Sequence, residues 1–121
     1  MLPAAHRLHR SADFARALRS GRRCARPALV VHLLVAAQAT PEDGGGPAVA
    51  KAGVVVSRAV GGSVVRHAVL RRFRALLGER LSRLPAGALL VVRARPLAAV
   101  TAYVDLGAQL DDCLERLQVA A

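Results

Sequence analysis

The sequence predicts one α/β domain, a two-layer sandwich in which helices pack on a single mixed β-sheet. Its 121 residues suit one compact domain spanning residues 1–121. A hydrophobic fraction of 54%, with 2% aromatic residues, supplies a core built mainly from Val, Leu and Ala. Short runs of branched residues alternate along the chain with longer segments whose apolar residues recur at helical spacing. Strands and helices that share one core in this way are typical of the α/β (α+β) class.

The first half of the chain predicts a helix followed by two strands. Residues 11–21 (SADFARALRSG) form a short helical pattern, whose first residue is a candidate N-cap and whose last is a candidate stop. Residues 29–35 (LVVHLLV) and 52–57 (AGVVVS) are short and rich in branched side chains, which favours strands. The Gly, Pro and acidic residues between them predict a flexible loop at about residues 38–50. Two strands around one loop suggest an antiparallel pair.

The second half predicts a long helix, a strand and a closing helix. Val60 is assigned to a short third strand, which ends at two glycines. Ser63 is a candidate cap for a helix over residues 63–84, and residues 88–92 (ALLVV) predict another strand. Residues 101–117 predict a helix with one apolar stripe. The stripe consists of Leu106, Leu110, Leu114 and Leu117. The predicted order is helix–strand–strand–strand–helix–strand–helix.

The charge balance indicates an anionic partner. Lys plus Arg number 18 against 8 for Asp plus Glu, which gives a net charge of +10, and Lys51 is the only lysine. A compositional preference for arginine would explain the choice of cation but not the excess over acids. A small domain this basic suggests nucleic acid or an anionic membrane surface.

Other features of the sequence favour a soluble cytoplasmic protein. The longest apolar run, residues 28–37, is too short to span a bilayer, and residues 1–21 contain no apolar segment typical of a signal peptide. Cys24 and Cys113 lack metal-ligand spacing, and two isolated cysteines are more often free cytosolic thiols than a disulfide.

The segment GGSVVRHAVLRRFRALL, residues 61–77, places the charge on one face of a helix. At about 100° per residue, an apolar arc lies beside a basic arc. The apolar arc contains Val65, Val69, Phe73 and Leu76, and the basic arc contains Arg66, His67, Arg71 and Arg74. No carboxylate occurs until Glu79, whereas an ordinary solvated face mixes both signs. Uncompensated arginines favour a polyanion, and RNA held by its backbone and shape fits them better than a DNA reader or a membrane helix.

The run VSRAVGGSVVRHAVLRRFR, residues 56–74, resembles the signature of the bacterial ribonuclease P protein subunit, which typically has the form VSKKxGNAVxRNRxKRxxR. The segment RLHRSADF at residues 7–14 and the strand ending in VVRARP are also similar to this family. Compared with the signature, His67 and Ala68 replace Asn-Arg, Ala59 replaces a lysine and Leu70 replaces another. The resemblance covers most of the chain, and its specific part is residues 56–74.

The resemblance implies a left-handed βαβ crossover that contains the basic helix. It also implies that the protein assists the catalytic RNA of ribonuclease P in endonucleolytic removal of the 5′ leader from precursor tRNA. The RNA would perform a Mg²⁺-dependent hydrolysis, so no catalytic residue, metal or further protein partner is expected in this chain.

The same resemblance assigns two sets of site residues. The first set would bind the RNA subunit: Arg58, Arg66, His67, Arg71 and Arg74. The second would line a cleft for the single-stranded leader: Phe14, Leu18 and His32, with Val31 as the alternative to His32 if the strand register differs. Core packing is the plain alternative for Phe14.

Three other functions compete with this one. A protein that cleaves RNA by itself would need clustered carboxylates or a histidine pair with a nearby lysine, and the sequence shows neither pattern. The remaining alternatives are a structural RNA-binding protein of the ribosomal type, without a processing role, and a DNA-binding protein.

Overall fold

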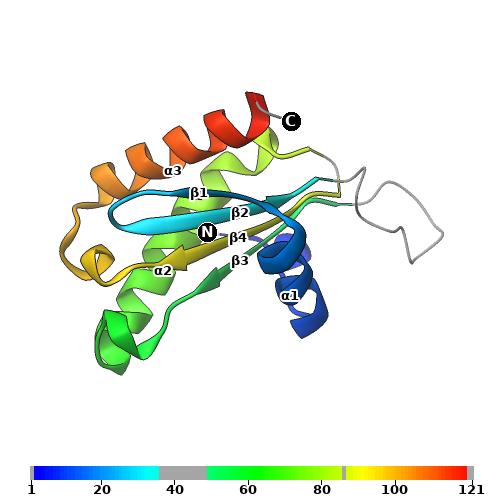
Figure 1. Ribbon diagram of the computed structural model, residues 1–121. Coiled ribbons are helices and arrows are strands. Elements are labelled where there is room, and N and C mark those ends of the chain that lie inside the picture. The colour runs from blue at the N-terminus through cyan, green and yellow to red at the C-terminus, as the bar shows by residue number, and fades with distance from the viewer. Residues whose placement is uncertain (1, 36–48, 86, 120–121) are drawn as a thin grey trace.

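The computed structural model describes residues 2–35, 49–85 and 87–119 and contains three helices and four strands (Figure 1). In chain order they are α1 (Ser11–Ser20), β1 (Arg22–Ala25), β2 (Leu29–Leu34), β3 (Lys51–Val55), α2 (Ser63–Arg80), β4 (Leu89–Ala94) and α3 (Tyr103–Val119). The predicted α/β class with one mixed sheet is therefore confirmed, and the number of helices and strands agrees, although not all of the strands are the predicted ones. The loop predicted at residues 38–50 lies largely outside the described residues.

The four strands form one mixed sheet in the order β1-β2-β4-β3. β1 pairs with β2 and β2 pairs with β4 antiparallel, whereas β3 pairs with β4 parallel. The expected pairing of β2 with β3 was wrong, because β4 lies between them. The burial of the two strands agrees with these positions. All six residues of β2 are buried, as expected for a central strand, whereas β3 lies at the edge of the sheet and three of its five residues are only partly buried.

Two strand assignments were also wrong. Val60 belongs to a 3-10 turn over Arg58–Val60 and not to a strand. The strand before β2 is instead β1, whose sequence RRCA has no branched residue and thus no strand signal. It forms because its backbone pairs with β2, and its two arginines suit an exposed edge.

The chain passes from β3 to β4 through α2, which lies behind the sheet in Figure 1. Both strands point to the left in that view, and β4 lies above β3. A helix behind the sheet with this displacement gives a left-handed crossover, as the family resemblance implied. Since nearly all βαβ crossovers are right-handed, general rules would have assigned the opposite hand.

The sheet is covered on both faces (Figure 1). The main core lies between the sheet and α2 with α3, and it includes the fully buried Phe73 and the predicted leucine stripe of α3. A smaller core lies under α1 and includes Ala17, Leu34 and Val91. α1 therefore lies on the sheet face opposite α2 and α3.

The predicted serine caps were wrong. Ser11 and Ser63 are the first helical residues, and the capping positions are Arg10 and Gly62. Neither position supplies a side-chain cap, so the first N–H groups of α2 are not capped by a side chain. The stop at Gly21 is confirmed, since its N–H donates to the carbonyl of Ala17.

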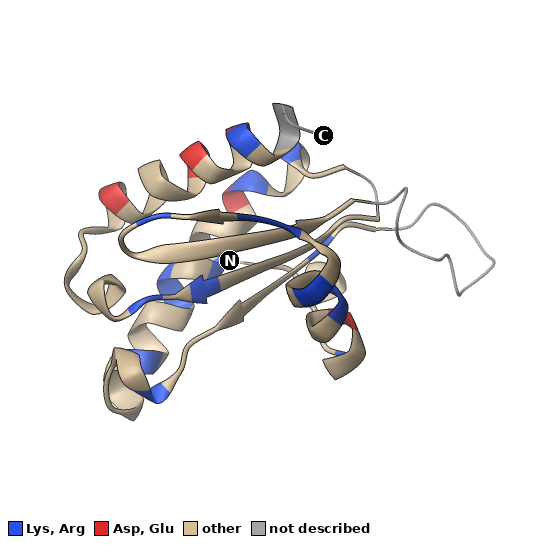
Figure 2. Cartoon of the chain, in the orientation of Figure 1, with Lys and Arg blue, Asp and Glu red and all other residues tan. Residues whose placement is uncertain are grey.

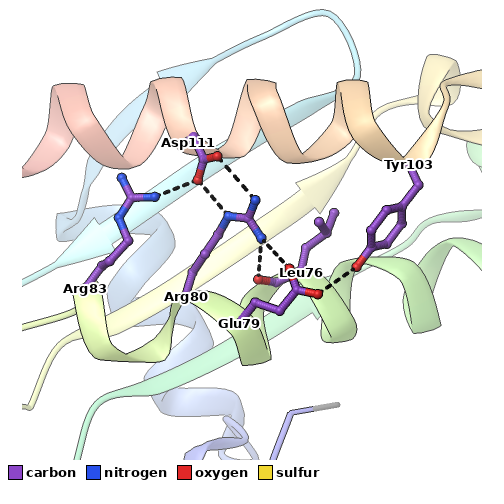
Figure 3. Close-up of polar contacts among 6 residues, drawn as sticks. All are labelled: Leu76, Glu79, Arg80, Arg83, Tyr103 and Asp111. Atoms are coloured by element: carbon purple, nitrogen blue, oxygen red, sulfur yellow. Dashed lines mark hydrogen bonds and ion pairs between the residues drawn. The ribbon is translucent and has the colours of Figure 1, made fainter.

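An arginine cluster locks α2 to α3 (Figure 3). The Arg80 side chain donates from Nε to Asp111 at 2.6 Å and from a terminal nitrogen to the other Asp111 oxygen at 3.2 Å. Arg83 adds a bond of 2.6 Å to the same carboxylate. The close approach needs Gly107, where a Cβ would lie 3.1 Å from Arg80 and 3.2 Å from Leu76. Asp111 is thus part of the helix–helix contact.

The pKa of Asp111 lies below its usual range, mainly because Arg80 donates hydrogen bonds to the ionised carboxylate. A lowered folded pKa adds stability above the unfolded pKa near 4, and this stability is lost as the pH falls through the folded value. We expect Asp111→Asn to lower the free energy of unfolding by about 1–2 kcal/mol at pH 7, a range reduced for the partial exposure of the carboxylate. The cost should shrink below about pH 3.

Asp112→Asn is the matched control. Asp112 is adjacent, more exposed, and lies 3.7 Å from Arg26, so its loss should change the free energy of unfolding by less than about 0.5 kcal/mol. Urea unfolding at pH 7 and pH 3 measures both variants. Equal costs for the two variants would show that Asp111 has no special role.

Cys24 and Cys113 are both free and buried, on β1 and α3. The Cys113 thiol donates to the carbonyl of Cys24 at 3.5 Å. Burial, with the neighbouring Cys24, raises the pKa of Cys113 to about 12. The thiol therefore stays protonated at neutral pH and acts as a core side chain.

Candidate nucleic-acid interface

The N-terminal half of α2 and the turn before it present a basic surface, which we define as Arg58, Arg66, His67, Arg71 and Arg74. The helix is oriented by Val69, Phe73 and Leu76, which are at most 2% exposed. The adjacent basic residues consequently face outward, with Arg66 and Arg74 half-buried and the other three exposed. Val65, expected in the core, is 40% exposed, because it lies in the first turn of the helix.

The basic surface has no acidic partner among the described residues. The ion pairs in the described part of the chain are made by arginines outside the basic surface. Two of these arginines, Arg80 and Arg83, pair with Asp111 of α3. Figure 2 shows acidic residues along α3 and none on α2 before Glu79. The arginines are thus divided into a structural pair, Arg80 at the end of α2 and Arg83 in the turn that follows, and an uncompensated group toward the N-terminal end of the helix. Crowded like charges lower stability, so an external anion is the natural partner.

A hollow of about 320 Å³ opens between α2 and the end of β3. Its lining combines three polar residues of α2 with three apolar residues: Ser63, Arg66, His67, Val54, Val56 and Leu70. The Nε atom of Arg66 is buried and has no hydrogen-bond partner in the described part of the chain. The sequence predicted Arg66 and His67 here but not Ser63, Val54 or Val56. Only tertiary contact between β3 and α2 brings these together.

The three predicted cleft residues lie on the face of the sheet that α1 covers. The ring of Phe14 lies over Gly53, where a Cβ would approach its Cζ atom to 2.5 Å. Phe14 is half-buried against the small core, and Leu18 is 37% exposed. His32 is 4% exposed and pairs in register with Val91, a member of that core. Val31 belongs to the core on the opposite face, so the register favours His32.

His32 is buried beside two arginines that the sequence did not single out. Both ring nitrogens are buried and lack a hydrogen-bond partner among the described residues. Burial lowers the pKa of His32, and the positive charges of Arg93 and Arg23 lower it further. The imidazole is therefore neutral at neutral pH. The alternation of side chains between the two faces of a sheet could have identified these arginines. Arg23 is the neighbour of His32 on β1, and Arg93 lies two residues after Val91 and therefore on the same face.

A lowered histidine pKa has a defined effect on stability. The unfolded chain binds a proton near pH 6.5 that the folded chain rejects, so stability is full above this pH and falls as the solution is acidified. We expect acidification from about pH 7.5 to 5.5 to destabilise the wild type more than His32→Leu, by up to about 1.4 kcal/mol for each pH unit below about 6.5 while the folded imidazole stays neutral. Urea unfolding across this range measures it, with His9→Leu, at an exposed histidine, as the control. Parallel pH profiles for wild type and His32→Leu would contradict the prediction.

The described residues contain no group of three or more His, Cys, Asp or Glu side chains that could hold a metal ion. Across the same residues, no helix is both long and apolar enough to cross a membrane. The chemistry that the two surfaces offer is charge, hydrogen-bond donors and apolar contact.

Comparison with known proteins agrees with this geometry. The family model described as Ribonuclease P matches residues 2–118. The chain is 54% identical over 114 residues to a ribonuclease P protein component of Thermobifida fusca, covering 94% of this chain and 77% of that one. It is 50% identical over 117 residues to the corresponding protein of Streptomyces bikiniensis, covering 97% and 95%.

Solved structures show the same fold. A Staphylococcus aureus RNase P protein mutant with defective mRNA degradation activity aligns with a TM-score of 0.77 at 23% identity, covering 94% of this chain and 89% of that one. The Thermotoga maritima RNase P protein aligns with a TM-score of 0.70 at 21% identity, covering 91% and 96%.

The uncompensated basic helix, the shared architecture and the match along almost the whole chain agree with one another. Ribonuclease P is an endoribonuclease of tRNA processing that works with an RNA subunit. The chain belongs to the ribonuclease P protein family, as the protein component of that enzyme.

Proposed function

We propose that the basic surface of α2 binds the RNA subunit of ribonuclease P and that the α1 face of the sheet binds the 5′ leader of precursor tRNA, in the cytoplasm. The RNA subunit would carry out the hydrolysis with Mg²⁺, and this chain would bind and position. The observation that supports the proposal best is the row of cations on α2 without acidic partners among the described residues. Such a row neutralises phosphates without reading base sequence.

The side chains on the α1 face of the sheet are of the kinds that bind single-stranded RNA. Arg23 and Arg93 supply cations beside the neutral His32, and Phe14 packs on the same face of the sheet. Single-stranded RNA is commonly held by cations along its backbone together with aromatic platforms for its bases. Since Leu18 and not an aromatic residue follows Phe14 by one helical turn, we expect few stacked bases and a larger share of backbone contact.

The test is a cleavage assay of precursor tRNA by ribonuclease P RNA, with and without the protein. We expect the protein to lower the Mg²⁺ concentration needed for cleavage, because it supplies positive charge that Mg²⁺ otherwise provides. The stimulation should weaken for precursor tRNA that lacks a leader. Absence of stimulation would reject the proposed function, and equal stimulation with and without leader would reject leader binding alone.

A further inference from the structure

The hollow between α2 and β3 differs chemically from the basic surface around it. Its walls include three aliphatic side chains, Val54, Val56 and Leu70, in a region otherwise rich in arginine. A phosphate is best held by cations and N–H groups and gains nothing from aliphatic walls. Leu70 stands where the family signature has a lysine, so this chain has exchanged a charge for apolar surface at the rim of the hollow.

The polar side of the hollow is equally distinctive. Ser63, Arg66 and His67 line it from three positions of one helix. The buried Nε of Arg66 lacks a partner in the described residues, and a buried donor left unpaired is costly. A ligand that brings an acceptor into the hollow would satisfy it.

The strand side adds a third kind of group. β3 is an edge strand, and on its outer edge the carbonyl of Ala52 accepts from the N–H of Leu8. Among the described residues, the N-terminal segment forms one bridge with β3, between Arg7 and Ala52, before the strand reaches Val54. An open strand edge presents backbone donors and acceptors together. The hollow thus places aliphatic side chains and a guanidinium side by side, next to the end of an edge strand.

We infer that this hollow binds a single unstacked nucleobase of the RNA subunit. A base has two apolar faces for Val54, Val56 and Leu70, and a polar edge for Arg66 and Ser63. Proteins hold unstacked RNA bases in this way, with apolar or guanidinium contact on the faces and hydrogen bonds on the edges. A volume of about 320 Å³ lies within the usual range of small-molecule sites. The inference rests on the proposed RNA contact of α2 and adds base contact to it.

The first experiment compares two probes that differ only in the base. The full-length protein, labelled for NMR, is titrated with adenosine monophosphate and separately with ribose 5-phosphate. We expect the nucleotide to shift the methyl signals of Val54, Val56 and Leu70 in a saturable way, and ribose 5-phosphate to leave them in place. Equal methyl shifts with both probes, or none with either, would overturn the inference.

The second experiment uses the RNA subunit and two variants of α2. Leu70→Ala removes one wall of the hollow, and we expect it to weaken RNA affinity about tenfold without changing the salt dependence, because no charge is lost. Val64→Ala is the matched control, since Val64 is 83% exposed on the same helix and does not line the hollow. Melting temperatures confirm that both variants fold. Full affinity in Leu70→Ala would overturn the inference.

The same binding measurements distinguish failure of the base site from failure of RNA binding by α2. If Arg66→Ala and Arg74→Ala flatten the salt dependence while Leu70→Ala binds normally, RNA binding by α2 stands and the base site fails. If none of the three variants changes RNA binding, the basic surface itself is not the RNA contact.

Discussion

Replacing Gly21 with alanine should lower the free energy of unfolding by about 2–3 kcal/mol, near the upper end for an overpacked site. Gly21 joins α1 to β1, and a Cβ there would lie 2.4 Å from the carbonyl oxygen of Ala17 and 3.1 Å from the carbonyl group of Leu33. Both neighbours are backbone, so relief requires α1 to move relative to the sheet. Because α1 carries Phe14 and Leu18, the same shift should weaken leader binding in the holoenzyme.

Gly62→Ala is the control for this substitution. Gly62 precedes α2, its φ of −70° and ψ of 178° suit alanine, and nothing lies within 4 Å of a Cβ placed there. Alanine reduces the flexibility of the unfolded chain, but it is a poorer residue than glycine at a helix capping position, so we expect a net change of less than about 1 kcal/mol. Urea unfolding of both variants gives the comparison. A Gly21→Ala protein as stable as Gly62→Ala would show that α1 is not held by this contact.

Replacing Arg66 and Arg74 together with alanine should weaken binding to the RNA subunit roughly fiftyfold at about 0.1 M salt. Each phosphate contact contributes a slope of about 0.9 in log affinity against log salt, which amounts to almost tenfold between 1 M and 0.1 M. Each single variant should flatten the slope by about one contact, and the double variant by about two. Both side chains are half-buried on the outward side of α2, and the ion pairs to α3 are made by Arg80 and Arg83 instead.

Arg116→Ala removes the same charge from a different surface. Arg116 is exposed on α3, the helix that carries four of the eight acidic residues of the chain (Figure 2). Its loss should leave the salt slope unchanged, although net charge falls equally. Filter binding or fluorescence anisotropy over a salt series measures the four variants and the wild type. Equal slopes for Arg116→Ala and Arg66→Ala would mean that binding follows net charge and not the α2 surface.

Helices were easier to predict from the sequence than strand pairing. The face of α2 followed from its periodicity, because Val69, Phe73 and Leu76 are buried where the projection placed them. Strand neighbours depend on contacts distant in the sequence, so the position of β4 between β2 and β3 was missed. β1 was missed for a related reason, since its pairing is made by backbone groups that carry no residue preference.

In the candidate site, too, local patterns could be predicted and long-range contacts could not. The cations of α2 could be predicted, because an uncompensated helix face is a local pattern. The hollow could not, since Val54 and Val56 meet Arg66 only after the crossover has folded. Likewise, Arg80 and Arg66 look alike in the sequence, and only the position of Asp111 on α3 makes one structural and leaves the other available.

The position of β4 also has a consequence for synthesis on the ribosome. β4 is the only strand that pairs with both β2 and β3 within the described sheet, and it ends at Ala94. The nascent chain therefore exposes its apolar β2 strand, without a partner on that side, until most of the protein has been translated. Nascent strands in this condition are prone to mispairing and aggregation. We expect the domain to fold only at a late stage of translation, so that the α2 surface becomes available to RNA as a finished unit.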